Sequence, residues 1–178
     1  MIFAEGGRSI GIRADETTAA YFGQRLARSA RSGLATPSQH ARAVVELSLA
    51  QGGRNPRALL GGEFAPDPAG AQTMFEVPYG LPLLEFGDVA ECRSELGKPL
   101  VAGLPSDFAD AALVGLTAGP AAETLPAGLL RVDRAGICPI DSSEMTFKFV
   151  GGLLCAVLSA LVQGEDPYLA AQAVMRGW

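Results

Sequence analysis

The hydrophobic pattern is clearest in the last third of the chain. Between Met145 and Val162 the only charged residue is Lys148, and an apolar run of this length is typical of a buried helix. Eighteen such residues also reach the lower limit for crossing a membrane. Because Lys148 and the pair Gly151-Gly152 interrupt the run, we predict the core helix of a soluble protein instead.

Capping residues predict where this helix and the next one begin and end. Asp141-x-x-Glu144 matches a capping box, so we expect the long helix to open at Asp141 and to end near Gly164. Asp166 followed by Pro167 then predicts a final helix that extends to about Arg176, because proline is favoured at the first helical position.

Two further helices are predicted in the first third of the chain. Between about Asp15 and Ser32, apolar residues recur at helical spacing, and these are Ala19, Phe22, Leu26 and Ala30. Thr36-Pro37 with Gln39 matches a T-x-x-Q capping box, which predicts a second helix from Thr36 to about Gln51.

The remaining elements are short. We expect strands within residues 2–13 on either side of a turn at Glu5–Arg8, at Thr73–Val77 and Leu83–Phe86 (paired as a hairpin), at Leu100–Gly103 and at Leu129–Val132. We expect helical segments at Pro56–Leu60, Asp88–Leu96 and Ser106–Ala118, and a loop over residues 61–71. Together these elements predict a single α+β domain over residues 1–178. It would contain a mixed sheet of four or five strands, covered by helices, and a long buried C-terminal helix.

Composition and charge narrow the classes of function. The chain has 178 residues, 48% of them hydrophobic, which suits one globular domain with its own core. A net charge of −5 argues against a nucleic-acid partner. The charge is uneven, at +4 over residues 1–60 and −9 over the rest. Either the two halves attract each other within the fold, or the arginine-rich part faces an anionic ligand or an acidic partner.

The cysteines predict free thiols. Cys92, Cys138 and Cys155 are odd in number and have no CxxC spacing, and a single histidine, His40, is too few to complete a structural zinc site. The opening residues lack the basic and long apolar regions of a signal peptide, so we expect a cytoplasmic protein. No P-loop, GxGxxG or metal-ligand motif is present, and we predict no cofactor and no metal.

The most suggestive chemistry lies in residues 133–144, where a strand leads through a turn into the long helix. A helix N-terminus offers free N–H groups and a positive dipole end, which favour anions. We therefore predict Arg134, Ser142 and Ser143 as ligand-binding residues, and Glu144, Asp141 and Cys138 as catalytic candidates. The alternative is that the serines and acids only cap the helix.

Other patterns carry weaker hypotheses. Cys138 could pair with His40 as a thiol dyad, although His40 is better explained as a packing residue. The long helix predicted from Asp141 carries a stripe of small residues, Gly152, Ala156 and Ala160. This stripe favours the close approach of another helix, either within the fold or in a homodimer. Arg25, Arg28 and Arg31 could form a solvated face or bind phosphate, and the two Gly-Gly-Arg turns could bind an anion or be ordinary turns.

Three functions follow from these patterns. The first is a small-molecule enzyme or metabolite-binding domain that holds an anionic ligand at residues 133–144. The second is a non-catalytic accessory or assembly protein acting through a homodimeric surface. The third is a thiol-dependent enzyme that uses Cys138. No membrane partner is expected.

Overall fold

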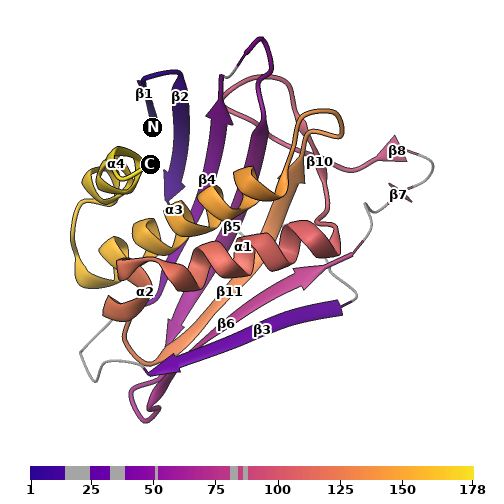
Figure 1. Ribbon diagram of the computed structural model, residues 1–178. Coiled ribbons are helices and arrows are strands. Elements are labelled where there is room, and N and C mark those ends of the chain that lie inside the picture. Colours follow the sequence, from indigo (N-terminus) through magenta and orange to yellow (C-terminus); the bar gives the residue numbers. More distant parts are fainter. Residues whose placement is uncertain (15–24, 33–38, 51, 81–83, 86–87) are drawn as a thin grey trace.

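The computed structural model describes residues 1–14, 25–32, 39–50, 52–80, 84–85 and 88–178 (Figure 1). The strands are β1 (Ile2–Glu5), β2 (Arg8–Ala14), β3 (Arg25–Ser32), β4 (Ala41–Leu49), β5 (Arg57–Pro66), β6 (Gln72–Tyr79), β7 (Leu84–Glu85), β8 (Asp88–Val89), β9 (Glu91–Cys92), β10 (Leu100–Ala102) and β11 (Gly128–Ile137). The helices are α1 (Ser106–Ala118), α2 (Pro120–Thr124), α3 (Glu144–Gln163) and α4 (Pro167–Arg176).

Nine of the eleven described strands form one mixed sheet, with the helices layered on one of its faces (Figure 1), and β7 pairs only with β8. The order is β1-β2-β4-β5-β11-β10-β9, and β6 and β3 branch from the first half of β11. Residues 128–131 of β11 pair in parallel with β6, while Val101 of β10 lies opposite Ile137 at its other end. The α+β class is confirmed, and the sheet is about twice as wide as the sequence predicted.

The helix predicted over residues 36–51 is wrong in its described part, which is strand β4. Side chains of β4 alternate between the two faces of the sheet, and Ala41, Ala43, Val45, Leu47 and Leu49 all belong to the main core under the helices. The opposite face takes Val44 and Glu46, and both are also buried. Apolar and polar residues alternate along β4 except at Val44, which is apolar on the second face and interrupts the period of two that distinguishes a strand from a helix. Thr36 and Pro37, on which the capping box rested, lie outside the described residues.

Three other predicted segments are also strands in the structure. Arg25–Ser32, predicted as the end of a helix that began at Asp15, is β3, and residues 15–24 lie outside the described part. Residues 56–66, predicted as a helical turn and a loop, are largely β5. Asp88–Leu96, predicted as a helix, holds the short strands β8 and β9. The predicted hairpin is also wrong, because the partners of β6 are β3 and β11.

The elements after residue 100 follow the sequence-based expectations closely, and so does the first hairpin. The turn between β1 and β2, the strand β10 and helix α1 all lie where they were predicted, and β11 extends the predicted strand in both directions. Helix α3 ends at Gly164, whose φ of 73° gives a left-handed cap, and Asp166 caps α4.

Helix α3 is the core helix of the domain. Its length and composition would allow it to cross a membrane, but 72% of its most apolar 18-residue stretch is buried inside the protein. Burial of this kind agrees with the core helix of a soluble protein. Its inner face packs on β4 and β5, and its side packs along the whole of α1 (Figure 1).

Glycines let α1 and α3 approach unusually closely. A Cβ atom placed on Gly115 would lie 2.0 Å from the carbonyl oxygen of Lys148, and one placed on Gly151 would lie 2.4 Å from that of Ala112. The small-residue stripe in the sequence predicted a close helix contact at Gly152, whereas the closest approach is at Gly115 and Gly151. A Cβ on Gly152 would meet only the oxygen of Gly115, at 3.6 Å. The close contact therefore requires glycine at positions 115 and 151, while the Cα of Gly152 faces a partly open space.

Candidate functional site

The turn before α3 uses its polar groups to build the helix start. Ser143 is the N-cap, and its Oγ accepts a hydrogen bond from the N–H of Thr146 at 3.2 Å. The helix therefore begins at Glu144, and the prediction that it opens at Asp141 is wrong. The N–H groups of Asp141 and Ser142 instead both donate to the carbonyl oxygen of Cys138, which forms a tight turn.

Ser142 connects this turn to the sheet. Its Oγ accepts from the N–H of Cys138 at 2.8 Å and donates to the carbonyl oxygen of Arg57. Two short contacts to backbone groups therefore hold this hydroxyl in place. Ser142 and Ser143, predicted as ligand-binding residues, both make bonds that organise the turn, as the capping alternative expected.

Arg134 lies on the other face of the sheet from α3. The register of β11 against β5 shifts between Val132 and Arg134, so the bulge changes which side chains face the helices. A Cβ placed on Gly61 would contact Val44 and the Cβ of Arg134. Val44 belongs to a second core on the face away from the helices, which consists of Val44, Leu59, Cys92, Leu100 and Ala102. Arg134 and the N-terminus of α3 therefore do not meet around one ligand.

The remaining predicted site residues are also dispersed. Glu144 is exposed and lines a shallow depression between α1 and α3, while Cys138 is half-buried against the second core. His40 lies at the start of β4, with Nε2 3.3 Å from a carboxylate oxygen of Glu63. Cys138 follows Ile137, which lies opposite Ala58 at the start of β5, whereas His40 contacts Glu63, five residues further along the same strand. The thiol and the imidazole are therefore separated by roughly 15–20 Å along β5. The Cys138–His40 dyad is therefore wrong.

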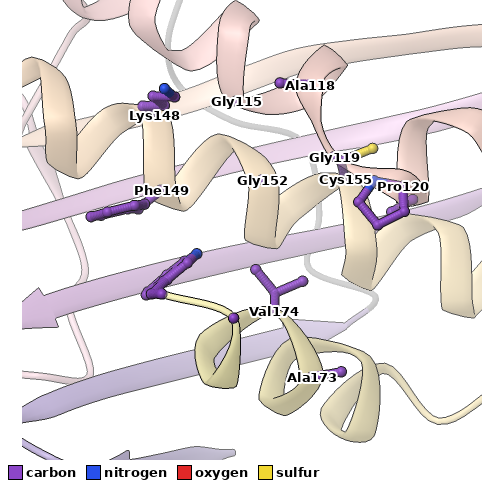
Figure 2. A pocket seen from close by; sticks show the side chains of 13 residues that line it. Gly115, Ala118, Gly119, Pro120, Lys148, Phe149, Gly152, Cys155, Ala173 and Val174 are labelled. Carbon is purple, nitrogen blue, oxygen red and sulfur yellow. The ribbon is translucent and has the colours of Figure 1, made fainter.

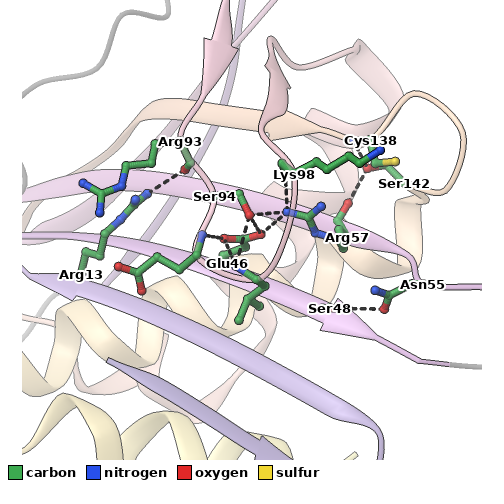
Figure 3. A network of polar contacts seen from close by, with 12 residues as sticks. Arg13, Glu46, Ser48, Asn55, Arg57, Arg93, Ser94, Lys98, Cys138 and Ser142 are labelled. Atoms are coloured by element: carbon green, nitrogen blue, oxygen red, sulfur yellow. Dashed lines mark hydrogen bonds and ion pairs between the residues drawn. The ribbon is translucent and has the colours of Figure 1, made fainter.

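A buried carboxylate that the sequence analysis missed organises the second face of the sheet. Glu46 is 2% exposed, and Figure 3 shows it beneath the loop that follows β9. It accepts hydrogen bonds from Arg57 at 2.7 Å, from the hydroxyl of Ser94 at 2.7 Å, and from the N–H groups of Glu95 and Leu96 at 2.8 and 3.4 Å. Four donors satisfy this carboxylate, so it clamps the loop onto the sheet and has no room for a ligand.

The open half of the same face carries a row of alternating charges. Strand registers place Arg28 opposite Glu76, Glu76 beside Arg131, Arg131 opposite Glu63, and Glu63 opposite Arg42. Two contacts within this row are ion pairs, Arg28–Glu76 at 2.9 Å and Arg42–Glu63 at 2.6 Å. Each arginine of the row has a carboxylate as its neighbour, which favours cross-strand stabilisation over phosphate binding.

The helical side of the molecule holds an apolar pocket of about 440 Å³ between the C-terminal end of α1, the middle of α3 and α4 (Figure 2). Gly152 and Cys155 lie on the α3 side of the pocket, and Val174 on the α4 side. The lining residues are small or apolar except for Lys148. They are Gly115, Ala118, Gly119, Pro120, Ala121, Lys148, Phe149, Gly152, Cys155, Ala173, Val174, Gly177 and Trp178.

An aromatic pair closes one end of this pocket. The ring of Trp178 stacks on that of Phe149, with centroids 4.4 Å apart. Arg8, from the start of β2, lies 5.8 Å from the Trp178 ring. It donates hydrogen bonds to the carbonyl oxygen of Met175 at 2.9 Å and to a main-chain oxygen of Trp178 at 3.2 Å. The arginine of the first Gly-Gly-Arg turn thus fixes a wall of the pocket, while the two glycines adopt positive φ as in an ordinary tight turn.

All three cysteines are free thiols, as predicted, and they differ in exposure. Burial raises the pKa of the Cys155 thiol from 9.0 to about 12, and the positive charge of Arg31 lowers it only in part. At pH 8 the Cys155 thiol therefore stays protonated. Iodoacetamide at that pH should modify the half-buried Cys138 first and Cys155 only after unfolding, as measured by peptide mass spectrometry. Equal rates at the two positions would contradict this assignment.

Comparison of the chain with protein-family models, with curated proteins and with solved structures gave no match. Within the residues that the structure describes, no group of three or more His, Cys, Asp or Glu side chains could hold a metal ion. The candidate site therefore rests on the geometry of the apolar pocket.

Proposed function

We propose that the protein is a non-catalytic domain that binds a small apolar molecule in the pocket between α1, α3 and α4. The observation that carries this proposal is the pocket itself, a half-open space of about 440 Å³ lined almost entirely by small and apolar groups. Ligand pockets in proteins typically measure about 300–1,000 Å³ and are mostly apolar. The space suits one molecule of roughly ten to fifteen heavy atoms.

The polar groups of the molecule support a binding role over catalysis. The hydroxyls of Ser142 and Ser143 are engaged with the backbone, and Glu46 is satisfied by four donors. The thiol that lines the pocket, Cys155, is held protonated by burial. A nucleophile needs an adjacent base or a lowered pKa, and Cys155 has the reverse shift.

Gly152 provides the test, because its hydrogen atoms face the pocket and leave room for a side chain. Gly152→Leu should fill the pocket while leaving the fold intact, since the nearest atom to a new Cβ is 3.6 Å away and leucine favours a helix over glycine. We expect the neutral fluorophore 1-aminoanthracene to bind the wild-type protein with saturation at one site, and Gly152→Leu to bind it at least ten-fold more weakly.

Gln163→Leu is the matched control, because it adds the same side chain to an exposed position of α3 outside the pocket. It should bind the fluorophore as the wild-type protein does. Unchanged binding by a folded Gly152→Leu variant would place the fluorophore elsewhere and refute the proposed pocket.

Self-association is the second candidate function, and the exposed apolar side chains beside the pocket favour it. Val114 of α1 is 47% exposed and Met145 of α3 is 60% exposed, and both line the neighbouring depression. A second copy that packed on α1 and α3 would cover them together with Gly152. Sedimentation velocity at tens of micromolar separates the two candidates. A monomer at that concentration would exclude self-association, whereas a dimer should bind the fluorophore less as the protein concentration rises.

The three free thiols fit a reducing compartment, and we propose a cytoplasmic location for either function.

A further inference from the structure

We propose that the ligand of this pocket is an amphipathic monocarboxylate, with a hydrocarbon chain in the pocket and its carboxylate at Lys148. The inference rests on the proposed function and adds the chemical class of the ligand. It starts from one asymmetry in the lining side chains, which is that twelve of the thirteen are uncharged and the other is a lysine.

Lys148 is available to a ligand. Its side chain is exposed on the first turns of α3, and among the described residues no carboxylate lies within the 4.0 Å that defines an ion pair with its ammonium. Figure 2 shows Lys148 near the close contact of α1 and α3, on the same side of the pocket as Phe149. A ligand whose anionic group met this ammonium would place its remaining atoms against apolar surface.

The surroundings of Lys148 favour a single negative charge on the ligand. Asp107, Asp110 and Glu144 line the adjacent depression, which shares Lys148 with the pocket. A dianion such as a phosphate monoester would bring its second charge toward these three carboxylates, and like charges in proximity are unfavourable. A monocarboxylate gains the contact with the ammonium and adds no further charge that needs a partner.

The rest of the pocket favours a hydrocarbon chain. No hydroxyl, amide or carboxylate side chain occurs among its lining residues, so a polar tail would lose its hydrogen bonds to water without replacement. A chain of about ten carbons is a suitable probe for this volume, and each buried methylene contributes to affinity by removing apolar surface from water.

Three probes with the same chain and different head groups test the inference. Decanoate, 1-decanol and decyltrimethylammonium are titrated below the concentrations at which they form micelles, and binding is followed by the fluorescence of Trp178, the single tryptophan of the chain. We expect decanoate to bind the wild-type protein roughly five- to ten-fold more tightly than decanol, since a lysine–carboxylate contact at a partly exposed site gives an advantage of that order.

Lys148→Gln should remove this advantage and leave decanol binding unchanged. Lys98→Gln, which removes the other lysine of the chain from an exposed loop, should behave as the wild-type protein for all three probes. Equal binding of decanoate and decanol, tightest binding of decyltrimethylammonium, or an equal loss for decanoate and decanol in Lys148→Gln would each overturn the carboxylate assignment while leaving an apolar pocket in place. If none of the three probes binds, the proposed function fails together with this inference.

Discussion

Replacing Glu46 with alanine should lower the free energy of unfolding by about 3–5 kcal/mol, the usual effect of removing one partner from a buried ion pair. The carboxylate is 2% exposed and Arg57 is 9% exposed, so the guanidinium would be left buried without its anion. The N–H group of Glu95 and the hydroxyl of Ser94 would lose their acceptor at the same time. Urea unfolding followed by circular dichroism measures the change.

Glu63→Ala is the matched control for this experiment. Glu63 pairs with Arg42 and His40 on the open half of the same sheet face, where solvent weakens the ion pair. Its loss should change stability by about 1 kcal/mol or less. If Glu46→Ala is no more destabilising than Glu63→Ala, the buried network does not hold the loop after β9 on the sheet.

Alanine at Gly151 should destabilise the protein by about 3 kcal/mol, whereas alanine at the next residue, Gly152, should stabilise it by up to about 1 kcal/mol. A Cβ on Gly151 would lie 2.4 Å from the carbonyl oxygen of Ala112, a backbone atom that moves only if α1 and α3 separate. A Cβ on Gly152 makes an ordinary contact, so the change mainly lowers the conformational entropy of the unfolded chain.

The adjacent positions control for each other, since both substitutions exchange glycine for alanine within the same helix. Thermal unfolding of the two variants should show melting temperatures on opposite sides of the wild-type value. Equal shifts in one direction would mean that the close approach of α1 and α3 does not depend on Gly151.

The sequence was most informative where turn and cap residues mark an element. Gly164 and Asp166-Pro167 delimit α3 and α4 through local chemistry, so those elements could be predicted without tertiary information. The strands β3 and β4 could not be predicted in this way. In β3 the apolar residues Leu26 and Ala30, four positions apart, imitate a helical period. In β4 only Val44 interrupts the alternation of apolar and polar residues, but the capping box at Thr36–Gln39 favoured a helix over a strand.

The candidate site was beyond sequence reasoning for a different reason. Its lining residues come from all four helices and from the residues that follow α1 and α4. Most of them are glycine, alanine, proline or valine, which carry no chemical signature. Gly152, Lys148 and Cys155 were noticed for other reasons, as a helix contact, an interruption of the apolar run and a free thiol, and none of these features predicts a pocket. Glu46 did leave a signal, since Glu46 and Ser48 alternate with Val45, Leu47 and Leu49, and a period of two in that segment would have identified both the strand and its buried carboxylate.

The late position of β11 has a consequence for synthesis of the chain. This strand lies between β5 on one side and β6 and β10 on the other, yet it is the last strand in the sequence. Until residue 137 has left the ribosome, β1-β2-β4-β5 and β3-β6 can form only as separate ribbons, each with an unpaired edge. Such edges can pair with other chains, so nascent chains and fragments that end before β11 should be the aggregation-prone forms of this protein.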